Sequence, residues 1–178
     1  SQHCTYCIIP KLRGKKRSRP PEDITAEAQD LLAAGVKELV LVAQDTTSYG
    51  KDLQPPSSLS QLVENLAGLP SPDKAGPGAW FRVLYGHPES IDDDFIKTVA
   101  SFPNICSYFD IPIQHVSSAI LKKMGRNYNQ DDLDRLFDKI RNKVPGASLR
   151  TTLIVGFPGE SEKDFKTLLR FVENTQFD

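Results

Sequence analysis

The sequence predicts an α/β fold with parallel strands and outer helices, because short apolar runs alternate with amphipathic helical segments along its 178 residues. Residues 39–43 are apolar without alternation, as expected for a strand that helices cover on both faces in a parallel sheet. Similar runs follow at residues 81–85, 109–113 and 151–155. Right-handed crossovers between such strands give either an open doubly wound sheet or a barrel, and the pattern itself leaves both open.

Five helical segments accompany these strands. The first two cover about residues 23–34 and residues 59–66, where apolar side chains recur at i, i+3, i+4 and i+7 before Gly68. The third covers residues 91–100 and carries three aspartates in its first turn, where the helix dipole favours acids. The fourth follows a capping Asn129, and the fifth follows Ser161 with Asp164 three residues on, as in a capping box.

The composition is that of a single globular domain over residues 1–178. Hydrophobic residues make up 39% and charged residues 25%, and the net charge of -1 makes no case for non-specific nucleic-acid binding by the whole surface. We expect residues 68–79 to form a long surface connection. The chain has no apolar stretch that spans a bilayer and no leader, so we expect a cytoplasmic protein without membrane contact, in which the three cysteines are reduced.

Polar or glycine-rich segments follow each predicted strand, where parallel α/β folds form their active sites. These segments are residues 44–50, 86–88, 114–115 and 156–160. The last one resembles a ligand-binding turn but lacks the Lys-Ser/Thr pair of a phosphate loop. We therefore expect a ligand site at this rim.

Cys4 and Cys7 form a C-x-x-C pair that has several interpretations. It fits half a zinc site, a redox dithiol, an iron–sulfur ligand pair or two ordinary cysteines. A second zinc pair is missing, since only Cys106 and three histidines remain. The residues by themselves leave these readings open.

With its context, the opening resembles the radical S-adenosylmethionine (SAM) motif C-x-x-x-C-x-aromatic-C. Cys4, Tyr6 and Cys7 match the last three specified positions, and the first cysteine would immediately precede Ser1. Five ordered blocks resemble the methylthiotransferase family: HCTYCIIPKLRGKKRSRP, LVLVAQDTTSYG, LYGHP, YFDIPIQHVSSAILKKMGR and LRTTLIVGFPGESEKDF.

This resemblance implies a partial (β/α) TIM-like barrel that is truncated at both ends and holds strands two to five of a (β/α)6 radical SAM barrel. The chain would then be a radical SAM core fragment, inactive alone. The family's N-terminal domain, with a second [4Fe-4S] cluster, and its C-terminal substrate-binding domain would lie outside it.

The resemblance also implies a reaction. A [4Fe-4S] cluster and SAM give a 5'-deoxyadenosyl radical, and a methylthio group is placed on C3 of an aspartate in a small-subunit ribosomal protein. AQDTTSYG and DIPIQH favour this branch over the branch that modifies a transfer-RNA adenosine. Two alternatives from other classes are a non-catalytic barrel that binds RNA or a ribosomal protein, and a zinc-dependent barrel enzyme.

The site residues follow from the same resemblance. Cys4 and Cys7 would be metal ligands, Tyr6 would lie against the adenine of SAM, and Gln44 would bind its methionine part. Gln114 and His115 would face the ribose or the substrate, and the adenine would be flanked by Ile154, Val155 and Gly156. No side chain is assigned a catalytic role, because the cofactor supplies the radical chemistry.

The implied partners are the ribosomal protein, an electron donor such as flavodoxin and, through the basic residues 11–19, ribosomal RNA. A solvated surface loop explains that basic segment equally well.

Overall fold

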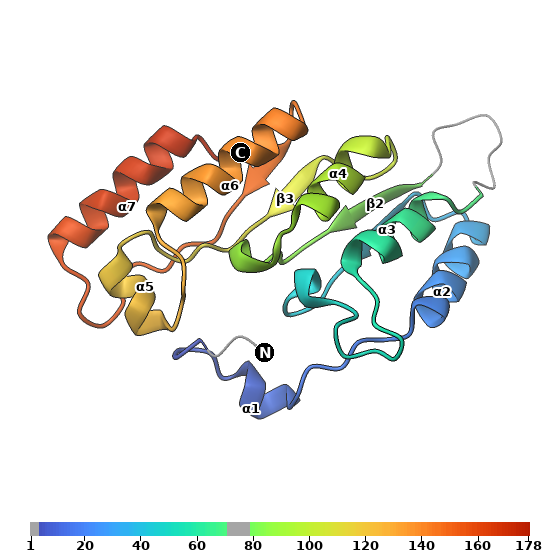
Figure 1. Cartoon of the computed structure of the whole chain (residues 1–178), viewed down its shortest axis with the longest axis horizontal. Coiled ribbons are helices and arrows are strands. Elements are labelled where there is room, and N and C mark those ends of the chain that lie inside the picture. The colour runs from blue at the N-terminus through green and yellow to red at the C-terminus, as the bar shows by residue number, and fades with distance from the viewer. Residues whose placement is uncertain (1–3, 71–78) are drawn as a thin grey trace.

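The computed structural model describes residues 4–70 and 79–178 (Figure 1). Most of the predicted connection at residues 68–79 therefore lies outside the described residues. The helices and strands follow in this order: α1 (Ile9–Arg13), α2 (Pro21–Ala33), β1 (Glu38–Leu41), α3 (Leu59–Ala67), β2 (Trp80–Val83), α4 (Asp93–Ser101), β3 (Tyr108–Asp110), α5 (Ser118–Met124), α6 (Gln130–Lys143), β4 (Ser148–Arg150) and α7 (Glu162–Thr175).

The strands pair in parallel, as the sequence predicts. Leu39 in β1 lies opposite Phe81 in β2, and Phe109 in β3 lies opposite Leu149 in β4. Phe81 also forms a parallel bridge with Ile105, just before β3. The four strands therefore follow one another side by side in chain order.

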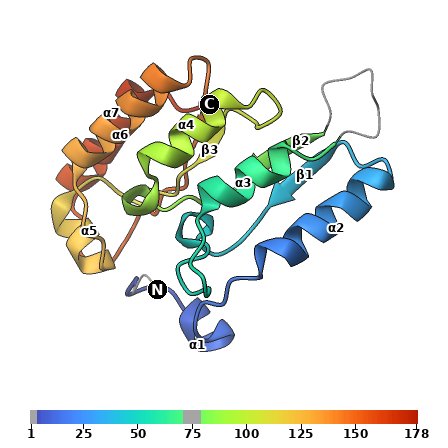
Figure 2. The same ribbon diagram turned by 45° about the vertical axis from the view of Figure 1, so that its right-hand side comes forward.

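Helices cover one face of this row of strands. Phe81, Phe109 and Leu149 are buried on the helix side, whereas Val40 and Trp80 on the opposite face are 46% and 43% exposed. In Figure 2 helices α3, α4 and α6 follow one another along the row. The expectation of cover on both faces was wrong, because one face of a barrel wall turns toward the barrel interior. A single row of outer helices is the architecture of a partial (β/α) barrel.

Local capping fixes the helix starts. Asn129 and Asp132 form a capping box at α6, and Ser161 and Asp164 form another at α7, which confirms both predicted caps. Ser58 and Gln61 form a third capping box, at α3. These reciprocal hydrogen bonds satisfy backbone donors that the helix leaves unpaired.

The fourth strand differs most from its prediction. β4 is Ser148–Arg150, and within the predicted run 151–155 an isolated bridge joins Leu153 to Gln114. The amide of Ile113 donates to the hydroxyl of Thr151 at 3.3 Å instead of to a backbone carbonyl, so regular pairing ends early.

Two short helices were not predicted. α1 overlaps the start of the basic segment, and α5 lies between β3 and α6. With five and seven residues, neither is long enough to show a full apolar period. No helix in residues 4–70 or 79–178 is long and apolar enough to cross a membrane.

Candidate functional site

The two cysteines lie on a loop that is anchored to the end of α5. The amide of Thr5 donates to the carbonyl of Met124 at 3.1 Å, and its hydroxyl donates to the carbonyl of Lys123 at 2.7 Å. Within the loop, the amide of Cys7 donates to the carbonyl of Cys4 at 3.1 Å. Both thiols are free and half-buried. The loop is thus fixed through its backbone, which leaves both sulfurs available as ligands.

Tyr6, between the two cysteines, packs against the loop that follows β4. Its ring meets Phe157 edge to face, with centroids 6.2 Å apart, and its hydroxyl accepts a hydrogen bond from Arg126 Nη2 at 2.9 Å. Burial raises the pKa of the phenol, so it stays protonated at neutral pH. Tyr6 therefore connects the cysteine loop to the rim of the barrel.

Arg126 continues this connection toward β2. Its Nη1 lies 2.5 Å from Nε2 of His87, and the amide of His87 donates to Oγ1 of Thr47 at 3.0 Å. A guanidinium can only donate, so Nε2 of His87 must be an unprotonated acceptor. Burial and the charge of Arg126 lower the pKa of His87 to about 4. The contacts from Phe157 through Tyr6, Arg126 and His87 to Thr47 thus link the ends of β1, β2 and β4 to the end of α5.

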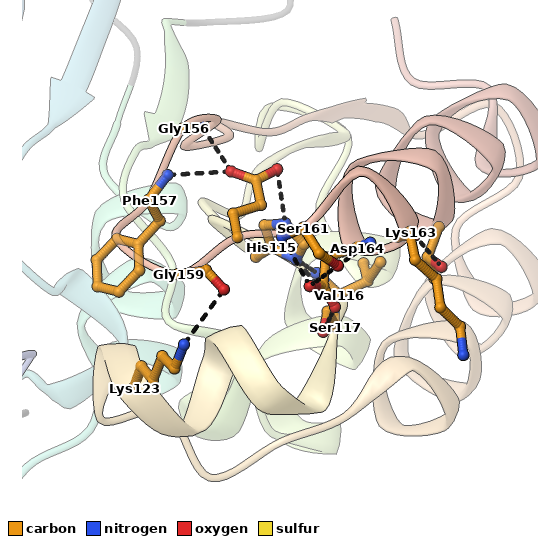
Figure 3. Close-up of polar contacts among 12 residues, drawn as sticks. His115, Val116, Ser117, Lys123, Gly156, Phe157, Gly159, Ser161, Lys163 and Asp164 are labelled. Carbon is orange, nitrogen blue, oxygen red and sulfur yellow. Dashed lines mark hydrogen bonds and ion pairs between the residues drawn. The ribbon is translucent and has the colours of Figure 1, made fainter.

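The loop after β4 is closed by Glu160. One carboxylate oxygen accepts hydrogen bonds from the amides of Gly156 and Phe157, and the other lies 3.4 Å from Nε2 of His115. Figure 3 shows His115 beside this loop, with Lys123 donating to the carbonyl of Gly159 at 3.2 Å. The carboxylate therefore holds the glycine turn in place.

Helices α5 and α7 are joined through Asp164. Its carboxylate accepts hydrogen bonds from the hydroxyls of Ser117 and Ser161, at 2.5 and 2.6 Å (Figure 3). These hydroxyl bonds, Ser117's first, together with the Ser161 amide, lower the pKa of Asp164 to about 2. The helix that anchors the cysteine loop is thereby tied to the helix after the glycine turn.

The predicted site residues lie at the carboxyl ends of the strands. Gln44 is exposed on the loop after β1, and Gln114 is half-buried with a positive φ of 67°. Val155 is 59% exposed, and Gly156 has a φ of 78°, where glycine avoids strain. His115 is fully buried, and both of its ring nitrogens have partners: the amides of Val116 and Ser117 donate to Nδ1, and Glu160 faces Nε2.

The donor chemistry of the cysteine loop fits a thiolate-bound metal group. Soft sulfur ligands suit iron–sulfur clusters and zinc. In residues 4–70 and 79–178, no third His, Cys, Asp or Glu joins Cys4 and Cys7 in a metal-binding group. The guanidinium of Arg126 is an electrostatic neighbour of Cys4 and would favour an anionic group there.

Arg126 and Glu160 are the site residues for which the sequence predicts no role. Arg126 follows Gly125, whose left-handed conformation ends α5, and this stop after a short helix is the available local signal. Glu160 lies four residues after Gly156 within the predicted rim segment, and its role depends on the folded turn at Gly156.

The basic segment divides into paired and unpaired charges. Lys16 pairs with Asp52 at 3.4 Å, and Arg19 pairs with Glu27 at 2.5 Å. Across the part of the chain that the structure describes, four exposed cations of this segment form no ion pair: Lys11, Arg13, Lys15 and Arg17. All four lie within residues 11–17, which follow the cysteine loop along the chain.

Comparison with solved structures supports the fold. SuiB from Streptococcus suis has a TM-score of 0.64 at 13% identity, over 98% of this chain and 35% of that chain. SuiB bound to S-adenosylmethionine has a TM-score of 0.62 at 13% identity, over 99% and 34%. At this identity the likeness concerns the fold alone, and it confirms the predicted barrel architecture.

Sequence comparison identifies much more similar relatives. The ribosomal protein uS12 methylthiotransferase RimO of Desulfosudis oleivorans is 55% identical over 177 residues, which are 99% of this chain and 39% of the relative. RimO of Clostridioides difficile is 54% identical over 178 residues, with 100% and 39% covered. The chain spans about two fifths of the length of these relatives. Residues 1–172 match the family model of the Radical SAM superfamily, and the chain therefore belongs to this superfamily.

Proposed function

We propose that the chain is the radical SAM core of an enzyme that places a methylthio group on C3 of an aspartate in ribosomal protein uS12. The observation that carries this proposal is the 54–55% identity, across the whole chain, to proteins named as uS12 methylthiotransferases. The domains outside this core would carry the second cluster and part of the substrate site.

Cys4 and Cys7 would hold a [4Fe-4S] cluster together with a cysteine expected directly before Ser1. When bound, the cluster and SAM supply the reactive species that removes hydrogen from an unactivated carbon. The backbone anchors at Met124 and Lys123 support this assignment, because they hold both sulfurs on one short loop.

The rim residues would bind SAM and exclude water. Tyr6 and the exposed Val155 offer apolar surface for the adenine, with Ile154 and Gly156 beside it, and Gln44 and Gln114 offer amides to its polar parts. The buried His115 would act by holding the turn at Gly156 through Glu160, which keeps the adenine surface in place.

The unpaired cations of the basic segment favour a contact with ribosomal RNA around uS12, since exposed Lys and Arg bind phosphates. Such a substrate implies a cytoplasmic enzyme, and a low-potential donor such as flavodoxin would supply electrons.

The test uses the full-length protein that contains this chain, reconstituted anaerobically and incubated with uS12, SAM, sulfide and a reductant. Mass spectrometry should find a methylthio group in place of one hydrogen on an aspartate of uS12. Transfer RNA in a parallel reaction tests the other branch of the family. A cluster-loaded, SAM-cleaving protein that modifies an adenosine and leaves uS12 unchanged would refute the proposed substrate.

A further inference from the structure

Arg126 lies where three parts of the site meet. Gly125, with φ 74°, ends α5, and the next side chain donates from Nη2 to Tyr6 and from Nη1 to His87. Its guanidinium carbon also lies 5.9 Å from the centroid of the Tyr128 ring. One side chain thus joins the cysteine loop to the end of β2 and to the start of the α6 region.

The charge of this guanidinium lacks a carboxylate partner. Among the described residues, Arg126 forms no ion pair, and its Nε is buried without a hydrogen-bond partner. Glu89 is 3.8 Å from His87 Nδ1, so it meets the imidazole and not the guanidinium. Arg126 is half-buried, and withdrawing even part of a cation from water is unfavourable unless a nearby anion compensates it. The arrangement therefore calls for a negative group.

The guanidinium donates to the hydroxyl of Tyr6, which stands two residues after Cys4 on the cysteine loop. Its electrostatic neighbours include Tyr128 and Cys4. Tyr128 also donates its hydroxyl hydrogen to the carbonyl of Ile113 at 2.7 Å. The sulfur of Cys4 is the remaining neighbour that becomes anionic, when it is a metal-bound thiolate.

We propose that Arg126 is a positioning residue whose positive charge compensates the anionic, thiolate-bound cluster at Cys4. Its guanidinium also holds the Tyr6 side chain of the cysteine loop in place through a hydrogen bond. The inference rests on the proposed cluster site, and it adds a residue outside the C-x-x-C pair that sets the cluster's reduction potential. Reduction adds one negative charge to the cluster. A fixed cation beside it therefore favours the reduced state that the proposed reaction requires.

The test compares three variants of the full-length protein after anaerobic reconstitution. Arg126→Gln removes the charge, and Arg126→Lys keeps the charge but lacks the planar guanidinium that donates to Tyr6 and His87 together. Arg135→Gln is the control. Arg135 lies exposed on α6 and pairs with Asp132. The cluster of interest is the one whose electron paramagnetic resonance signal changes when SAM is added.

Arg126→Gln should disfavour one-electron reduction of that cluster about tenfold, which is a midpoint potential about 59 mV more negative. Arg126→Lys should restore most of this shift, and Arg135→Gln should leave the potential unchanged. An unchanged potential in Arg126→Gln overturns the inference, and the same result with a raised Kd for SAM assigns the charge to the SAM carboxylate instead.

Hydrogen exchange in the cluster-free protein tests positioning separately. Both Arg126→Gln and Arg126→Lys should speed exchange at the amides of Thr5 and Cys7, which the folded loop protects. Unchanged exchange in both variants overturns the positioning role. A wild-type protein that takes up no iron refutes the proposed function instead, so the two failures are distinguishable.

Discussion

Glu160 Oε1 lies 3.4 Å from Nε2 of His115, and the two side chains are 6% and 0% exposed. Since two backbone amides donate to Nδ1 of His115, its Nε2 carries the hydrogen that faces the carboxylate. The other oxygen of Glu160 accepts from Gly156 and Phe157. A buried histidine at the end of one strand thus holds the glycine turn at the end of the next.

We predict that Glu160→Ala destabilises the protein by about 2 kcal/mol, because it removes charge-assisted hydrogen bonds from the amides of Gly156 and Phe157 and from the buried His115. It should also weaken SAM binding, since the turn at Gly156 is released. Glu160→Gln should recover only part of the loss. Its carbonyl oxygen can still accept from the amides of Gly156 and Phe157, but its NH2 group then faces the hydrogen on Nε2 of His115. Chemical denaturation and calorimetric titration with SAM measure both effects.

The control for this prediction is Glu162→Ala, two residues on, since Glu162 is exposed and pairs with Lys166 on the surface of α7. Equal losses of stability in Glu160→Ala and Glu162→Ala would show that the turn does not depend on the buried carboxylate.

The lowered pKa of His87 predicts that the folded protein loses stability in mild acid. Burial and Arg126 lower its pKa from 6.5 to about 4, so the unfolded chain binds more protons between these values. Stability should therefore fall as pH decreases through this window, by about 2 kcal/mol between pH 7 and pH 5 for His87 alone. Urea unfolding across this range should show a smaller pH dependence in His87→Gln than in the wild type. Superimposable curves for the two proteins would contradict the assignment.

The basic segment predicts a salt-dependent contact with ribosomal RNA. Glutamine at positions 11, 13, 15 and 17 should weaken binding and reduce the slope of log affinity against log salt by about 0.7 to 0.9 for each lost phosphate contact. Fluorescence anisotropy with a ribosomal RNA fragment measures this slope. A matched control removes four cations of the helical surface, by glutamine at Lys97, Arg135, Lys139 and Lys166. Equal slopes for the two variants would mean that net charge alone governs binding.

The sequence predicts the parts of the fold that local patterns determine. Asn129 and Ser161 cap their helices as expected, because a capping box involves residues within one turn. The strands are parallel and in chain order. The exposed inner face was not predicted, because Val40 and Val42 are as apolar as the partly buried Leu39 and Leu41. Apolar composition identifies the strand without showing which face meets a helix.

The site was predicted less completely, for a physical reason. Cys4, Tyr6 and Cys7 stand together in the sequence, and their motif is local. Arg126 acts on Tyr6 across 120 positions of the chain, so no local spacing relates the two. Glu160 depends on the backbone of Gly156, whose positive φ is a property of the folded turn.

The iron content of the full-length protein tests the central proposal most directly. Cys4→Ser and Cys7→Ser should each lose about four iron atoms, one [4Fe-4S] cluster, together with cleavage of SAM, because each removes a ligand thiolate. Cys106→Ser, which alters a half-buried thiol near Arg82, should retain both. Wild-type iron content and SAM cleavage in the Cys4 and Cys7 variants would contradict the account.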